Sequence, residues 1–161
     1  MLKPWTLVIT LHAIVAVTAI VLGTFNAVRM VRGDRLHKAV GRTWAGLMLF
    51  ISITGLFIGD YKSGIGIFLH GLAIWTIISI SLGIYFARRG NIKSHKGFML
   101  GSYFGLLGAL IGVISVPTRR VPSYFHAYPL AMTVITIAVI AGSGFVIAGF
   151  STAARRHVNH I

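Results

Sequence analysis

Five stretches of about 20 residues in this chain are almost free of charge, and they decide what it can fold into. An α-helix needs roughly 20 apolar residues to cross the hydrocarbon core of a bilayer. With 56% hydrophobic and 11% charged residues, the 161-residue chain also carries more apolar surface than a soluble domain of its size buries. The sequence therefore predicts an all-α membrane protein with five transmembrane helices. The stretches are 5–28, 40–59, 65–86, 98–116 and 128–150.

The connections between these stretches are short, so we expect a single transmembrane domain over residues 1–161. The first stretch is too long for a signal-peptide core and no cleavage site is evident, which favours a retained helix. Asp34 is expected to cap the second helix, and Asn91 or Ser94 the fourth. Pro117 and Pro122 predict a loop between the fourth and fifth helices.

The positive charges are distributed unevenly between the two ends of the predicted helices. The formal net charge is +13, and cytoplasmic loops of membrane proteins collect Lys and Arg. Eleven cations fall on one side and four on the other, so we expect the amino terminus outside and the carboxyl terminus in the cytoplasm. The eleven are Arg29, Arg32, Arg35, Lys38, Arg42, Arg88, Arg89, Lys93, Lys96, Arg155 and Arg156; the four are Lys3, Lys62, Arg119 and Arg120.

The lack of cysteine, and of acidic residues in the predicted helices, argues against several classes of function. The sequence has no cysteine, which excludes disulfides, thiolate clusters and covalently attached haem. Its only acidic residues, Asp34 and Asp60, fall in predicted loops, so no carboxylate lies within the bilayer. Because proton-coupled transporters and pumps usually need such a carboxylate, this argues against them.

Aromatic residues and glycines follow patterns common in membrane helices. The fourth stretch repeats the GxxxG spacing, which favours close helix packing within a bundle; a flat surface for a planar ligand is the alternative. Aromatic side chains near both ends of the stretches predict a belt at each membrane boundary. The glycines are Gly101, Gly105, Gly108 and Gly112; the belt residues are Trp5, Tyr61, Tyr124 and Tyr128 outside, with Trp44 and Tyr85 inside.

The histidines recur with one spacing. A shift of 58 positions aligns His12 with His70 and His37 with His95. His37 follows His12 by 25 positions, and His95 follows His70 by the same number. Only six residues are identical between positions 11–38 and the aligned segment, so the indication of a repeat depends mainly on the histidines. The pattern predicts two helix-pair repeats, at about 5–59 and 65–116, that form an antiparallel four-helix core with a fifth helix beside it.

In such a core, helices one and three lie diagonally opposite, as do helices two and four. His12 and His70 would then share the outer leaflet, about 7–10 Å from the helix ends, while His37 and His95 share the inner end. Two imidazoles that face each other at one depth are what a bis-histidine haem requires. We therefore expect these histidines to bind the iron of two haem b groups, with basic residues near the propionates. Those residues are Lys38, Arg42 and Lys96 inside; Arg119, Arg120 and His126 are candidates for an outer substrate site.

These segments resemble the cytochrome b561 family of di-haem membrane electron carriers. The resemblance spans about residues 8–116 and implies that His12 pairs with His70 and His37 with His95. The short length, the LHK-x-x-GR element and the fifth helix look still more like a bacterial family of predicted membrane proteins described only by a domain of unknown function. The matching text is His12, NAVRMV at 26–31, RLHKAVGR at 35–42, ITGLFI at 53–58, FLHG at 68–71 and SHK at 94–96.

The hypothesis that follows is a b-type cytochrome of a bacterial inner membrane, a transmembrane oxidoreductase that moves electrons between a quinol or small reductant and an acceptor. No catalytic residue is assigned. The partners expected are membrane lipid and the reductant, with no nucleic acid; a homo-oligomer is compatible with the sequence. The alternatives are a histidine-lined carrier of zinc, copper or a small molecule, and an accessory membrane subunit without chemistry.

Overall fold

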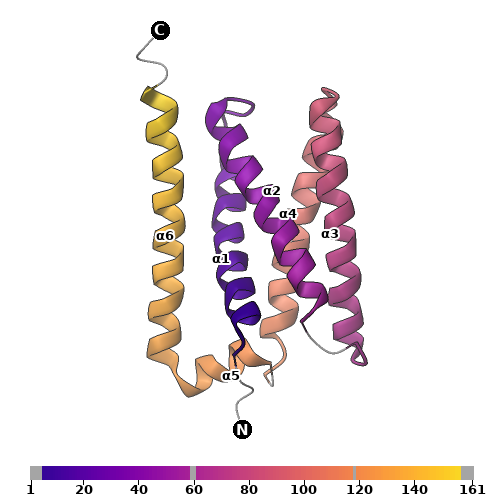
Figure 1. The fold of residues 1–161 in the computed structure, drawn as a ribbon, viewed down its shortest axis with the longest axis vertical. Helices are drawn as coiled ribbons and strands as arrows, with labels where there is room; N and C mark the ends of the chain where they lie inside the picture. The colour runs from indigo at the N-terminus through magenta and orange to yellow at the C-terminus, as the bar shows by residue number, and fades with distance from the viewer. Residues whose placement is uncertain (1–4, 59–60, 118, 157–161) are drawn as a thin grey trace.

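A computed structural model of the chain describes residues 5–58, 61–117 and 119–156 (Figure 1). Every regular element in these ranges is a helix, and five of the helices are long and apolar enough to cross a membrane. The predicted fold class is therefore confirmed. The helices are α1 (Leu7–Val28), α2 (Arg35–Leu56), α3 (Gly64–Arg88), α4 (Ile92–Ile114), α5 (Arg120–Ala127) and α6 (Pro129–Arg156); all but α5 are candidate spans.

Polar caps set where the second and fourth helices begin. The Asp34 carboxylate accepts a hydrogen bond from the backbone N–H of His37 at 3.0 Å, and the Asn91 side chain accepts one from Ser94 at 3.1 Å. Such caps satisfy backbone donors that the first turn leaves without partners. Both helices therefore start five or more residues before the apolar stretch predicted from sequence, and their first turns carry the cationic residues.

Helices α1 to α4 form a ring in which each packs against its neighbours in the chain, and α1 closes the ring against α4. Within the described residues, α1 does not contact α3, nor α2 contact α4, as the diagonal arrangement predicts. Helix α6 lies outside the ring, against α1 and α2 (Figure 1). Among the described residues, the largest fully buried side chains are Leu22, Val40 and Ile80.

The connection between α4 and α6 differs from the prediction. The predicted loop contains α5, and Pro122 is the third residue of this helix. A proline in the first turn costs little because the N–H that it lacks would have no intrahelical acceptor. Helix α5 packs against α4 and α6 at the end of the bundle opposite the α1–α2 and α3–α4 connections (Figure 1).

Two residues of the predicted aromatic belt differ in their surroundings. Trp5 meets Tyr124 edge to face, with ring centroids 5.5 Å apart, at the end of the bundle where α5 lies. Trp44, predicted at the inner boundary, is instead only 5% exposed. It lies on the face of α2 that carries Val40 and Met48, and residues three or four positions apart share one face of a helix.

The four glycines of the GxxxG spacing in α4 share one face of the helix but differ in what lies beside them. Side chains of α3 lie 3.5 Å and 3.6 Å from where a Cβ would stand on Gly105 and Gly112, which confirms the predicted packing role for these two. Nothing lies within 4 Å of such an atom on Gly101 or Gly108. Gly105 and Gly112 therefore lie at the interface with α3, whereas Gly101 and Gly108 have open space beside them.

Candidate functional site

His70 is the most completely enclosed of the predicted ligands. Its side chain on α3 is 8% exposed, and Nδ1 lies 2.6 Å from the carbonyl oxygen of Gly66. A carbonyl only accepts, so Nδ1 carries the proton and Nε2 keeps a lone pair. Nε2 is buried and has no hydrogen-bond partner. A buried polar atom without a partner is uncommon, and metal-ligating histidines share this arrangement, in which one ring nitrogen is held by a carbonyl and the other is left for the metal.

Tyr61 stacks against His70 from the connection between α2 and α3. The ring centroids are 4.0 Å apart and the planes are inclined by 32°. The tyrosine hydroxyl in turn donates to the carbonyl of Leu56 at the end of α2. Two contacts therefore fix the imidazole, one through its Nδ1 edge and one through its face, and they leave the Nε2 edge without a protein partner.

His12 is held against α2. Its Nδ1 lies 2.9 Å from the hydroxyl oxygen of Thr54, whose single proton is directed to the carbonyl of Phe50 at 2.8 Å. The histidine is therefore the donor, again with Nε2 left to accept. His12 lies five residues into α1 and His70 six residues into α3, or about 7.5 Å and 9 Å from the helix starts. The two histidines lie at similar depths, as the sequence predicts.

The inner histidines lie at the same end of the bundle, each in the first turn of its helix. His95, in the first turn of α4, has Nδ1 2.9 Å from the carbonyl oxygen of Gly83 on α3, which places its proton on Nδ1. His37, in the first turn of α2, has a buried Nδ1 with no partner. Their shared end of the bundle agrees with the repeat, and the pairing of the two imidazoles stays a prediction.

An ion pair positions the turn that carries His37. Arg29 donates two hydrogen bonds to Asp34, at 2.5 Å and 2.7 Å, and the same carboxylate accepts from the backbone of His37. The guanidinium, and then the backbone N–H, hold the pKa of Asp34 well below its ordinary value. The hydrogen bond to the carboxylate likewise raises the pKa of Arg29. The α1–α2 connection is therefore fixed three residues before the histidine.

Several buried polar atoms on the inner half of the bundle were not among the predicted site residues. Asn26 Oδ1, Trp44 Nε1 and Ser102 Oγ are all buried without a hydrogen-bond partner. Asn26 packs on α2, where its Nδ2 lies 3.2 Å from a Cβ position on Gly41. It opens the NAVRMV segment, but an intramembrane amide alone does not indicate a ligand class. Its role depends on the neighbours that only the fold supplies.

The predicted basic residues lie at the two ends of the bundle. Lys38, Arg42 and Lys96 are exposed on the first turns of α2 and α4, next to the inner histidines in the chain. At the other end, Arg119 and Arg120 begin α5, and His126 is exposed in its last turn. Because α5 packs on α4 and α6, no contact joins His126 to His12 or His70 in the described residues. An outer substrate site there stays a prediction.

Metal ions such as zinc take three or more side-chain ligands in proteins. In residues 5–58, 61–117 and 119–156, no group of three or more His, Asp or Glu side chains comes together. The metal-carrier alternative therefore gains no support from this part of the chain.

A bundle of five apolar helices with buried imidazoles defines a polytopic α-helical membrane protein. Residues 9–151 match the family described as predicted membrane protein (DUF2306), and the chain belongs to that family. A comparison with curated proteins finds no match, and a comparison with solved structures finds none either. The family match supports the predicted membrane protein of unknown function; it gives no support to the cytochrome b561 resemblance.

Proposed function

We propose that this protein is a transmembrane b-type cytochrome that passes electrons between a quinol or small reductant and an acceptor across a bacterial inner membrane. The observation that carries the proposal is the state of His70, whose Nδ1 is bonded to the Gly66 carbonyl while its buried Nε2 has no partner. Axial histidines of haem proteins are oriented in this way, with one nitrogen on the iron and the other held by a backbone carbonyl or a carboxylate.

The other histidines fit the group to different degrees. His12 and His95 also donate through Nδ1 and so present Nε2 for ligation. His37 differs because its Nδ1 is the buried atom without a partner. We propose that His12 and His70 hold an outer haem and that His37 and His95 hold an inner one.

Haem would supply the one-electron chemistry, whereas the chain supplies ligands, an apolar environment and charge. Lys38, Arg42 and Lys96 stand near the inner pair, where cations would stabilise haem propionates. Two haems, one in each leaflet, would carry electrons through a bilayer that otherwise insulates. The greater number of cations at the ends of α1 and α3 supports an orientation with that end in the cytoplasm.

The proposal is tested by the absorption spectrum of the protein purified in detergent, recorded oxidised and then reduced with dithionite. We expect reduced b-haem bands and two haems per chain by extraction. Apoprotein purified without haem should take up added haem to the same ratio. Colourless, iron-free protein that does not take up haem would overturn the proposal, and stoichiometric zinc in such a sample would favour the carrier.

A further inference from the structure

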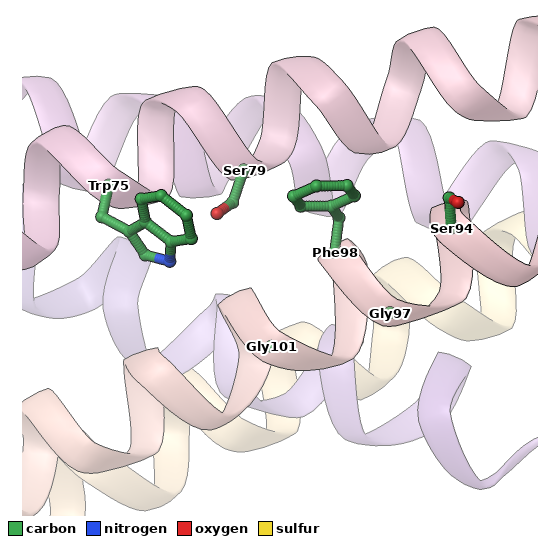
Figure 2. Close-up of a pocket in the computed structure, with 6 residues that line it drawn as sticks. All are labelled: Trp75, Ser79, Ser94, Gly97, Phe98 and Gly101. Carbon is green, nitrogen blue, oxygen red and sulfur yellow. The ribbon is translucent and has the colours of Figure 1, made fainter.

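A groove of about 340 Å³ lies between α3 and α4 (Figure 2). This volume is within the range of roughly 300–1,000 Å³ that small-molecule sites occupy. Trp75 and Phe98 lie on either side of Ser79, as Figure 2 shows. Nothing lies within 4 Å of a Cβ position on Gly97 or Gly101, so these two glycines leave the α4 wall of the groove open. Ser94 completes the lining.

Ser79 is the most buried polar residue in the lining of the groove. Ser79 is 3% exposed, lines the groove, and makes no hydrogen bond to any described residue. Its neighbours behave differently: Thr76 and Ser81 each donate, at 2.8 Å, to the carbonyl four residues earlier. A hydroxyl buried in an apolar site without a partner is unfavourable. The groove therefore presents a hydrogen-bond donor that lacks an acceptor.

The groove adjoins the helix turns that carry His95. Gly83, one turn beyond Ser79 on α3, supplies the carbonyl that His95 bonds. Ser94 precedes His95 in the chain, and Phe98 Cβ lies 3.3 Å from a Cβ position on Gly83. A molecule in the groove would thus lie beside the helix turns that carry the proposed inner ligand.

The depth of Ser79 restricts what could accept its proton. The residue lies nine positions before the end of α3 at Arg88, or about 13 Å from that end of the helix. At that depth a phospholipid offers only acyl chain, since its ester oxygens lie near the interface. An occupant that satisfies the hydroxyl must be lipid-soluble and must carry its own acceptor.

We propose that this groove binds the ring of a lipid-soluble quinone. One ring carbonyl accepts from Ser79 Oγ, the ring contacts the side chains of Trp75 and Phe98, and the isoprenoid tail leaves into lipid. The inference deepens the proposed function and rests on it, because a quinol is one of the two kinds of reductant proposed there. Binding itself requires no iron and can be measured on haem-free protein.

The test is a titration of the full chain in phosphatidylcholine nanodiscs with a short-chain ubiquinone, followed by quenching of tryptophan fluorescence. We expect saturable quenching that falls in Trp75→Phe. Ser79→Ala should weaken binding by about 3- to 10-fold, the usual effect of one lost hydrogen bond. Gly101→Leu, which fills the groove, should abolish saturation. Ser81→Ala is the matched control, since Ser81 is exposed and already bonded to Ile77, and it should bind as the wild type does.

A second comparison needs no variant. An analogue with the same ring and tail but no carbonyl oxygens should bind wild-type protein about as weakly as the quinone binds Ser79→Ala. Quenching that rises linearly, or that is equal in wild type, Ser79→Ala and Gly101→Leu, would mean simple partitioning into lipid and would overturn the inference. Saturable quinone binding by protein that takes up no haem would support this site and reject the proposed cytochrome. Haem uptake without saturable quinone binding would support the cytochrome and reject this site.

Discussion

The Nδ1 atom of His95 lies 2.9 Å from the backbone carbonyl oxygen of Gly83, so an imidazole on α4 is oriented by the backbone of α3. Gly83 is buried, and a Cβ at this position would meet the end of Met99 and the Cβ of Phe98. The absence of a side chain therefore lets α4 approach closely enough for the hydrogen bond. The bond fixes the tautomer of His95 and directs its remaining lone pair to Nε2.

His70 gives the sharpest mutational test of the proposed cytochrome. Its replacement by alanine removes one axial ligand of the outer haem only, so the haem content of His70→Ala should fall from about two per chain to about one. Pyridine haemochrome assay on purified protein measures this ratio. His126→Ala is the control, because His126 is exposed on α5 and should leave both haems in place. Unchanged haem content in a folded His70→Ala protein would contradict the assignment.

Gly23 should be a stability-determining position. A Cβ there would stand 2.7 Å from both Trp44 Nε1 and Tyr103 Cδ2, and these rings cannot move without disturbing the core. Overpacking of this kind costs about 1–3 kcal/mol. We therefore expect Gly23→Ala to lower the thermal unfolding temperature in detergent. Gly46→Ala is its matched control on α2, with nothing within 4 Å of the new atom; a similar loss in both variants would show that packing is not the cause.

Asp34 should contribute stability through two separable interactions. Asp34→Asn loses the ion pair with Arg29 but keeps an oxygen to cap His37, whereas Asp34→Ala loses both. The expected order of unfolding temperatures at pH 7 is wild type, then Asp34→Asn, then Asp34→Ala. The reverse order of the two variants would show that the cap contributes nothing.

The same residue predicts a pH dependence. The pKa of Asp34 is lowered in the folded protein, first by the hydrogen bond from Arg29. A carboxyl of this kind contributes fully above its unfolded-state pKa, about 3.9, and loses that contribution as the pH falls toward the lower folded value. The difference in unfolding temperature between wild type and Asp34→Asn should therefore be constant near neutrality and shrink below about pH 4. A difference that persists in strong acid would exclude the ion pair as its source.

The proposed orientation of the helices in the membrane can be measured by labelling introduced cysteines, because the wild-type chain has no cysteine. Met30 in the α1–α2 connection is 95% exposed, and Tyr128 between α5 and α6 is 56% exposed. With the cation-rich end in the cytoplasm, a membrane-impermeant maleimide added to intact spheroplasts should label Tyr128→Cys and spare Met30→Cys. Lysed spheroplasts, in which both sites should react, are the control. Labelling of Met30→Cys alone in intact spheroplasts would invert the topology.

The number of spanning helices and their order could be predicted from sequence because the bilayer sets a length that apolar stretches must match. Helix caps such as Asp34 could also be predicted, because a cap depends only on residues a few positions away. The apolar stretch alone predicts a start of α2 that is too late. The short helix α5 was missed because Pro122 signals a break unless its place in the first turn is known. Trp44 was misplaced because interfacial and core tryptophans look alike in a helical sequence.

The chain alone thus determines that imidazoles recur at equal spacing in two helix pairs, since spacing along a helix fixes depth in the membrane. It does not determine what each imidazole bonds. The acceptors for His12, His70 and His95 are a hydroxyl on a neighbouring helix and two backbone carbonyls, which appear in no sequence pattern. The packing of α1 to α4 selects the partners of His12 and His95, because a hydrogen bond forms at about 3 Å and that closeness depends on how helices rotate and approach. The partner of His70 is the carbonyl four residues earlier on its own helix, and the rotamer of the imidazole selects it.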